Sequence, residues 1–190
     1  MAESAIAPDW RSRRPTDPGA TGRDEVRGWE AEIYAPCRGD IGTARFVVAK
    51  RLFAKMKAIA DTGFIVAFGN REDTHHSWAV DISKRIREPL LTCEAVLAEA
   101  AFQLASVDLV FALVRDEMLR VAFDLTRNLD QLADLAHRYR DRKPDLADLC
   151  LVRMSELYPR YVVITVDSGD FRVYRRNKRE VIPILCPPIS

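Results

Sequence analysis

The sequence predicts an α/β fold in three layers, in which helices cover both faces of a central, mostly parallel sheet of four to five strands. From residue 56 onward, short apolar runs of strand character alternate with longer segments of helical periodicity. Such alternation is typical of parallel sheets, because each parallel connection needs a crossover. The apolar content of 48% is also sufficient for a buried core.

Residues 1–55 are predicted to be an N-terminal extension outside a domain that spans 56–190. The extension contains glycines, scattered arginines and four prolines without a sustained hydrophobic period: Pro8, Pro15, Pro18 and Pro36. Such a segment buries too little apolar surface to offset its ordering entropy, so we expect it to be largely disordered. Residues 44–55 are basic and could form a short helix. Met56 could also serve as an alternative start, which would make the extension dispensable for the fold.

The first part of the domain is expected to contain a short buried strand at 57–60 and a helical turn at 64–68. Thr74 is predicted to be the N-cap of a helix over residues 75–87, because a hydroxyl can accept from the free N–H groups of a first turn.

The middle of the domain is expected to begin with a brief strand at 89–91. Thr92 is predicted to cap a helix over residues 93–105. A further helix over 107–116 and a strand over 119–123 follow.

The last part begins with an amphipathic helix over residues 126–140, whose apolar residues recur at helical spacing. Pro144 is placed at the first turn of a helix over 145–157, where its missing N–H is harmless. The strongest strand is predicted at 161–166. An edge strand over 181–185, which tolerates Pro183, completes the sheet.

Four acidic residues stand in positions that would bring them together. Asp61 and Asp167 each follow a predicted strand, where the carboxyl ends of parallel strands form ligand sites. Glu99 interrupts an apolar helix, and Asp148 lies near the start of another helix. Converging carboxylates repel one another unless a divalent cation neutralises them. The pattern therefore predicts a hard-metal site of the kind that hydrolyses phosphodiesters.

Each acid also has a structural explanation. Asp167 and Asp170 stand in an Asp-Ser-Gly-Asp stretch, which is a common loop composition. Asp61 could belong to the turn before Gly63, and Glu99 could pair with an internal arginine. Asp145 and Asp148 share a helix face in a first turn, where the helix dipole alone favours negative charge.

The motifs around these acids resemble those of the PIN domain family, in particular the VapC-type toxin ribonucleases. Residues 56–68 (MKAIADTGFIVAF), followed by DTHH at 73–76, are similar to the first motif, and residues 91–100 (LTCEAVLAEA) to the second. Residues 145–148 (DLAD) are similar to the third motif, and residues 165–167 (TVD) with DF at 170–171 to the fourth. The resemblance covers about residues 56–186.

This resemblance implies an endoribonuclease that depends on Mg²⁺ or Mn²⁺. Asp61 and Asp148 would be the primary metal ligands, with Glu99 and Asp167 completing the acidic pocket. Four neighbouring residues would have auxiliary roles: Thr62, Asp145, Thr165 and Asp170. The resemblance also implies the toxin of a type II toxin–antitoxin pair, with an RNA substrate, an antitoxin partner and a homodimer.

A basic run follows the last acidic motif and is the candidate RNA-contact surface, because an acidic pocket needs flanking cations to attract RNA. It contains Arg172, Arg175, Arg176, Lys178 and Arg179. The alternative is an ordinary solvated face.

Other functions remain open. A PIN-like RNA-processing nuclease outside a toxin–antitoxin system, or a catalytically silent PIN-like RNA-binding module, would carry the same motifs. A phosphatase of the aspartyl-phosphate type would want Asp-x-Asp after the first strand, where Gly63 stands, and a receiver domain fits the spacing poorly. The net charge of +1 excludes attraction of nucleic acid by the molecule as a whole.

The four cysteines are widely spaced, without a Cys-x-x-Cys motif, so they do not predict a zinc site. Free thiols fit a reducing compartment. No apolar run is long enough to span a membrane, and the first thirty residues lack an apolar signal core. We therefore expect a cytoplasmic protein.

Overall fold

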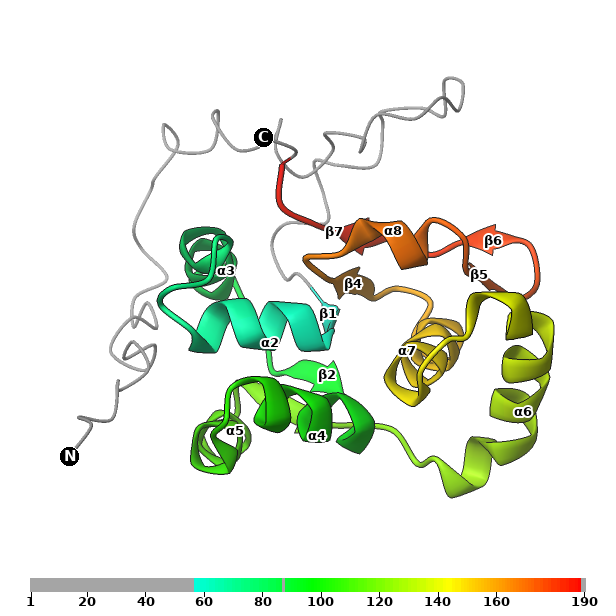
Figure 1. Cartoon of the computed structure of the whole chain (residues 1–190), viewed down its shortest axis with the longest axis horizontal. Helices are drawn as coiled ribbons and strands as arrows, with labels where there is room; N and C mark the ends of the chain where they lie inside the picture. The colour runs from blue at the N-terminus through cyan, green and yellow to red at the C-terminus, as the bar shows by residue number, and fades with distance from the viewer. Residues whose placement is uncertain (1–56, 87, 189–190) are drawn as a thin grey trace, which may run out of the picture.

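A computed structural model describes residues 57–86 and 88–188 of the chain (Figure 1). The expectations for residues 1–55, including disorder, the helix at 44–55 and the start at Met56, lie outside the described residues.

Five strands form one parallel sheet in the order β3-β2-β1-β4-β7. The strands are β1 (Ala58–Ala60), β2 (Leu90–Thr92), β3 (Leu119–Val121), β4 (Val162–Ile164) and β7 (Ile184–Leu185). In the register of the sheet, Ile59 pairs with Leu91 on one side and with Val163 on the other. The predicted parallel α/β sheet is therefore confirmed, with β1 at its centre.

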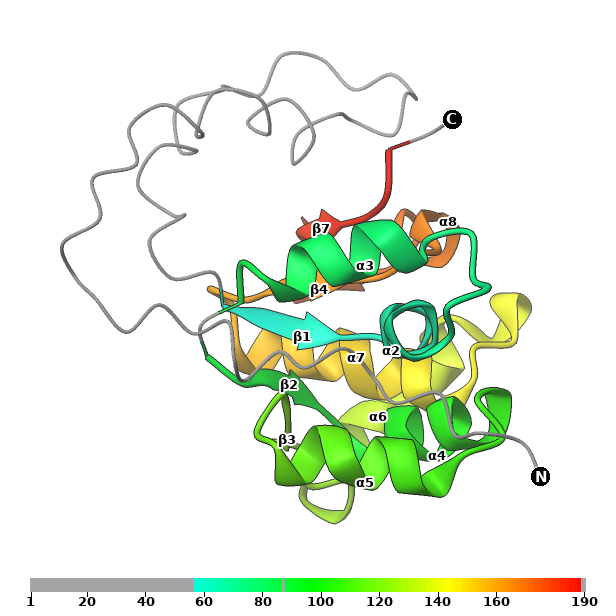
Figure 2. The ribbon, with the colours of Figure 1, turned by 90° about the vertical axis from the view of Figure 1, so that its left-hand side faces the viewer.

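Seven α-helices connect or flank these strands in the described part of the chain: α2 (Thr62–Gly69), α3 (His76–Ser83), α4 (Glu94–Gln103), α5 (Val107–Arg115), α6 (Leu129–Arg138), α7 (Leu146–Leu157) and α8 (Ser168–Phe171). Figure 2 shows α3 and α5 in front of the sheet and α7 behind it. Helix α7 contacts β1 and β4, and α5 contacts β3. Both faces of the sheet are therefore covered, as the strand–helix alternation predicts. No helix in this part of the chain has the length and apolar character that a bilayer crossing requires.

The core is centred on β1, whose three residues are all buried. Phe64 and Phe68, one turn apart on α2, stack with ring centroids 6.5 Å apart, and Trp78 of α3 meets Phe64 edge-on at 6.0 Å. These aromatic contacts fix α2 and α3 together next to the end of β1.

Both predicted threonine caps are wrong. Helix α3 begins at His76 without a side-chain cap, and Asp73 rather than Thr74 makes the preceding turn by accepting from the His75 N–H at 2.7 Å. Thr92 is the last residue of β2, and its hydroxyl donates across the sheet to the Ala60 carbonyl at 3.3 Å. In both cases a tertiary or turn contact takes the place of the expected cap.

The predicted strand at 181–185 is divided in two by Pro183. Residues Glu180–Val181 form β6, which pairs antiparallel with β5 (Arg175–Arg176), whereas β7 pairs parallel with β4. Pro183 has no N–H to donate, but its carbonyl accepts from the Val163 N–H at 2.9 Å. The proline thus separates the short β5–β6 hairpin from the edge strand β7.

Several element boundaries also differ from the prediction. The helical turn at 64–68 is part of the longer α2, and the helix expected over 126–140 starts as a 3-10 turn at Thr126–Asn128 before α6 begins. Asp145 is the N-cap of α7, so Pro144 precedes the helix instead of standing in its first turn.

Candidate active site

Asp61 occupies the junction between β1 and α2, where the chain leaves the centre of the sheet (Figure 1). Its Oδ1 caps α2 by accepting from the Thr62 N–H at 2.7 Å. Its own N–H donates to the Ile164 carbonyl of β4 at 3.0 Å. A side chain held at both a strand end and a helix start has little freedom to turn away from the sheet edge.

Gly63 allows the start of α2 to lie close to the end of β4. A Cβ atom at this position would lie 2.5 Å from Val166 Cγ2, a clash that a short branched side chain cannot relieve. The absence of a side chain at Gly63 therefore brings Asp61 next to the segment that carries Thr165 and Asp167.

Thr165 connects Asp61 with the loop after β4. Its buried hydroxyl donates to Asp61 Oδ2 at 2.6 Å and accepts from the Asp167 N–H at 3.0 Å. The exposed Asp167 side chain accepts from the Gly169 N–H at 2.7 Å, which shapes the turn into α8. One hydroxyl thus fixes both the first acid and the backbone of the fourth.

Thr62 connects Asp61 with Glu99 of α4. The buried Thr62 hydroxyl donates to Glu99 Oε2 at 2.8 Å, and Gln103, one turn further along α4, donates to Glu99 Oε1 at 3.0 Å. Glu99 is half-buried and has both carboxylate oxygens engaged by neutral donors. Its place on the apolar side of α4 is therefore explained by hydrogen bonds instead of an internal arginine.

The acids of the third motif lie at the start of α7. Asp145 is exposed, and its Oδ1 caps the helix by accepting from the Asp148 N–H at 2.7 Å. Asp148 is half-buried, and its Oδ2 accepts from the Tyr174 hydroxyl at 3.1 Å. Tyr174 is itself held between Phe171 and Tyr139 by edge-on ring contacts.

The pKa of Asp61 is raised from 3.8 to about 6; burial is the largest cause of this rise, and the charges of Glu99 and Asp145 contribute to it. The hydrogen bonds from Thr165 and Thr62 oppose this rise in pKa, because they favour the carboxylate form. The upward shift of this pKa shows that negative charge at Asp61 is costly in the folded protein. Glu99 and Asp145, which come from α4 and from the start of α7, lie close enough to contribute to that cost.

No lysine or arginine forms an ion pair with Asp61, Glu99 or Asp145 in the described part of the chain. Within residues 57–86 and 88–188, no three Asp, Glu, His or Cys side chains form a group that could by itself hold a metal ion. Asp61, Glu99 and Asp145 therefore form an open acidic cluster, with which no described lysine or arginine forms an ion pair.

The oxygen donors of this cluster suit one class of ion. Mg²⁺ and Mn²⁺ prefer carboxylate oxygens, and Mg²⁺ keeps several waters, so one or two protein carboxylates together with substrate phosphate complete its shell. An open cluster of carboxylates fits such an ion, because the protein does not have to supply all of its ligands.

The basic run divides into two groups. Arg175 donates to the carbonyls of Arg172 and Tyr174, and Arg176 pairs with Glu180 at 3.0 Å and donates to the Pro159 carbonyl. These two arginines stabilise the β5–β6 hairpin. The exposed members of the run are Arg172, Lys178 and Arg179.

Two residues of the cluster were not expected to have a role. Gln103 could have been found from its spacing, because residues four apart on a helix are neighbours. Tyr174 gives no such signal, since its contact with Asp148 depends on how the hairpin segment returns to α7. The backbone of Asp170 lies in α8.

Comparison with known proteins identifies the family of the chain. The family model of the PIN domain matches residues 58–177, which is 120 of the 190 residues and includes Asp61, Glu99, Asp145, Asp148 and Asp167. No curated protein matches the chain. The chain therefore belongs to the PIN domain family, whose members are generally nucleases and typically use divalent metal ions.

Proposed function

Starting from this family membership, we propose that the protein is an endoribonuclease that depends on Mg²⁺ or Mn²⁺ and hydrolyses RNA phosphodiester bonds. The observation that carries the proposal is that Asp61 has a raised pKa and no cationic partner among the described residues. Its pKa is raised to about 6, two further acids contribute to that rise, and none of the three has a cationic partner among the described residues. Such repulsion is relieved when a cation binds.

Asp61 and Asp148 are the proposed ligands of the ion, and Glu99 and Asp167 complete the pocket. A bound Mg²⁺ or Mn²⁺ would supply Lewis-acid activation of the scissile phosphate and of the attacking water.

The side chains around the acids supply orientation. Thr165 holds Asp61 Oδ2, and Tyr174 holds Asp148 Oδ2, so neither carboxylate has to be ordered when the substrate arrives. Glu99, held by Thr62 and Gln103, is the acid we assign to orient the attacking water and to accept its proton. The exposed cations Arg172, Lys178 and Arg179 are the proposed phosphate contacts.

The test is cleavage of a synthetic RNA by the purified full chain with Mg²⁺, with Mn²⁺ and with EDTA. We expect cleavage with either metal and none with EDTA. Asp61→Asn should abolish cleavage, whereas Asp134→Asn, at an exposed acid of α6, should leave it unchanged. A silent RNA-binding module would bind the RNA without cutting it, and this result would overturn the proposal.

Metal binding can be followed separately from cleavage. An ion that binds only the folded state stabilises it by about 1.4 kcal/mol at ten times its dissociation constant. Mg²⁺ or Mn²⁺ should therefore raise the melting temperature of the wild-type chain and of Asp134→Asn. Asp61→Asn should show little shift, and an equal shift would place the ion elsewhere.

We further propose that the protein is the cytoplasmic toxin of a toxin–antitoxin pair, that it forms a homodimer, and that α4 and α5 provide the dimer surface. Three large apolar side chains on these helices are exposed: Phe102 by 86%, Val107 by 52% and Phe111 by 58%. Val107 and Phe111, four residues apart on α5, share one helix face. Apolar exposure of this kind is typical of a protein interface.

Light scattering tests this surface. The wild-type chain should be a homodimer, and Phe102→Ser with Phe111→Ser should make it monomeric. Val181→Ser, at an apolar residue on β6 that is 60% exposed, should not change its mass. A small adjacent gene whose product abolishes RNA cleavage would support the toxin assignment. Its absence would favour an RNA-processing nuclease.

A further inference from the structure

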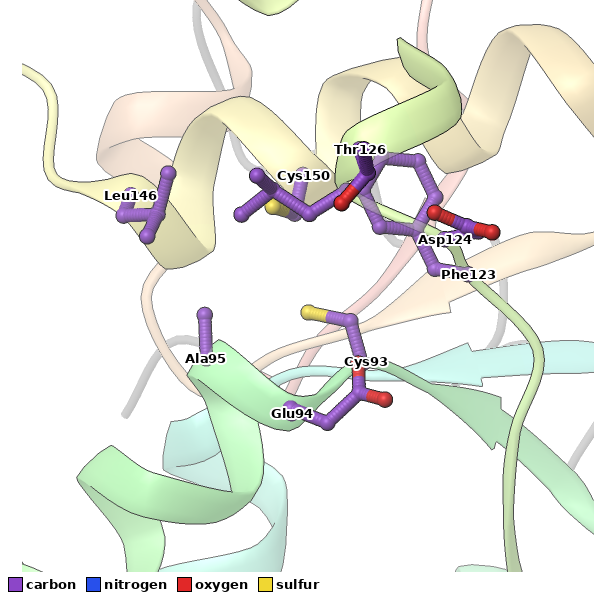
Figure 3. Close-up of a pocket in the computed structure, with 9 residues that line it drawn as sticks. Cys93, Glu94, Ala95, Phe123, Asp124, Thr126, Leu146 and Cys150 are labelled. Atoms are coloured by element: carbon purple, nitrogen blue, oxygen red, sulfur yellow. The ribbon is translucent and has the colours of Figure 1, made fainter. Parts of the chain in front are cut away.

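Two cysteines face one pocket beyond the carboxyl ends of β2 and β3. Cys93 follows β2 directly and precedes α4, and Cys150 lies in α7; both are free and buried. They line a pocket of about 530 Å³ together with Phe123, Leu146 and Thr126. Figure 3 shows the Cys93 side chain pointing from the start of α4 toward α7, which carries Cys150.

Both thiols line this pocket, and they are chemically unequal. The Cys150 thiol is the largest influence that lowers the pKa of Cys93. The N–H groups of Val96 and Ala95 lower it further, although neither makes a cap hydrogen bond of ordinary geometry, and burial opposes them. A thiol whose pKa is lowered and that shares a pocket with a second thiol is typical of a reactive pair.

The rim of the pocket restricts what can reach the thiols. Glu94 and Asp124 line the pocket as exposed acids, and Asp124 is paired with Arg127 at 3.2 Å. Glu94 has no hydrogen bond or ion pair in the described part of the chain. Its charge disfavours anionic reagents such as glutathione disulfide, whereas a small neutral oxidant carries no such penalty.

We propose that Cys93 and Cys150 form a peroxide-sensitive dithiol that closes to a disulfide between the start of α4 and α7. The Cys93 thiolate attacks one oxygen of hydrogen peroxide, the O–O bond breaks, and Cys93 sulfenic acid and hydroxide are formed. The Cys150 sulfur then attacks the Cys93 sulfur, the S–O bond breaks, and water leaves. In total, two thiols are oxidised, one peroxide is reduced and two waters are formed.

The position of the pair connects this chemistry to the acids. Cys93 precedes α4, which carries Glu99, and Cys150 lies in α7 beyond Asp145 and Asp148. A disulfide confines the two Cα atoms to a separation of about 4.4–6.8 Å, so closure would tie the start of α4 to α7. Since catalysis by this cluster rests on the proposed function, the effect on activity does so too. A displacement of about 1 Å is enough to reduce a rate by about a hundredfold.

Peptide mapping of the full chain tests the disulfide without any activity measurement. After treatment with one equivalent of hydrogen peroxide, non-reducing mass spectrometry should find the Cys93 and Cys150 peptides joined, with the loss of two hydrogens. Cys150→Ser should instead leave a Cys93 sulfenic acid that dimedone traps, and Cys186→Ser should still form the link. Failure to find the link, or pairing of Cys93 with Cys37 or Cys186, overturns the proposal. Faster closure by glutathione disulfide than by peroxide overturns the choice of oxidant.

RNA cleavage gives the second measurement. The oxidised wild-type chain should be at least tenfold slower than the reduced chain, and dithiothreitol should restore the rate. Peroxide-treated Cys150→Ser should keep most of its activity. If the disulfide forms and the rate does not change, the coupling to the acids is wrong. If the reduced chain never cleaves RNA, the proposed function fails while the peptide map still decides the disulfide.

Discussion

Beyond the carboxyl ends of β1 and β4 the next residues are Asp61 and Thr165, whereas beyond β2 and β3 they are Cys93 and Ala122. All four strand ends lie along one edge of the same parallel sheet. One half of this edge holds acids within hydrogen-bonding reach of threonines, and the other half is a pocket with buried thiols and Phe123.

This difference shows that the sheet determines where a site lies but not its chemistry. Parallel strands deliver whichever residues follow them to the same edge. Polar partners on neighbouring strands make the β1–β4 half an open acidic cluster, and apolar surroundings make the β2–β3 half a place for thiols. Helices α4 and α7 belong to both halves. Helix α4 carries Glu99 and directly follows Cys93, and α7 carries both Asp148 and Cys150.

After the loss of cleavage in Asp61→Asn, the largest effect within the acidic half is expected at the start of α7. Asp148→Asn should lower metal-dependent RNA cleavage by at least about a hundredfold, because it removes a proposed ligand. Asp145→Asn keeps a good N-cap residue and removes only a charge that raises the pKa of Asp61, so it should cost a few-fold at most. Steady-state rates with saturating Mg²⁺ compare the two. A larger loss in Asp145→Asn would transfer the ligand role to Asp145.

A hydroxyl in each half allows a matched comparison. Thr165→Val removes the donor to Asp61 and the acceptor for the Asp167 N–H without changing the shape of the side chain, and we expect a loss of activity of about ten- to a hundredfold. Thr126→Val removes an exposed hydroxyl at the rim of the thiol pocket and should leave the rate unchanged. If the two variants lose activity equally, the two halves do not differ in function as proposed.

The raised pKa of Asp61 predicts how the stability of the protein depends on pH. Between pH 3.8 and about 6 the unfolded chain has lost the Asp61 proton and the folded chain keeps it, so the free energy of unfolding falls as the pH rises through this window. The fall from this residue is on the order of 2 to 3 kcal/mol, at 1.36 kcal/mol per pH unit. It is complete above about pH 6.

Urea unfolding in EDTA at several pH values measures this effect. Asp61→Asn has no proton to lose and should show a flatter profile than the wild-type chain between pH 4 and 6. Asp134→Asn should follow the wild-type profile. A wild-type profile parallel to that of Asp61→Asn would mean that the pKa of Asp61 is not raised.

The smallest effect is expected from the exposed cations near the acidic half. Changing Arg172, Lys178 and Arg179 together to Gln should weaken RNA binding a few-fold. On single-stranded RNA, the slope of log K against log salt should become shallower by about 0.7 for each phosphate that the variant no longer neutralises. Fluorescence anisotropy over a salt series measures this slope.

The same change at three exposed arginines elsewhere provides the control: Arg115, Arg120 and Arg138. This variant should bind RNA with the wild-type salt slope. If both triple variants change the slope alike, RNA binding is not specific to the hairpin region.

Local sequence patterns were sufficient for the fold class and for the order of its elements. The apolar run that contains β1, the periodicity of α4 and α7, and the acids beside them are all visible in short windows. Where the prediction fails, a residue prefers a distant partner to the expected local one. Thr92 caps no helix because the Ala60 carbonyl lies across the sheet from it, and Pro183 divides the last strand because only its carbonyl can join the sheet.

The sequence alone determined which residues follow the strands and which of them carry charge. Only the tertiary structure decided that Thr62 reaches Glu99, that Thr165 reaches Asp61 over 104 positions, and that Cys93 faces Cys150. The physical reason is that strand and helix propensities act over a few residues, whereas the neighbours of a side chain at the sheet edge depend on the strand order β3-β2-β1-β4-β7.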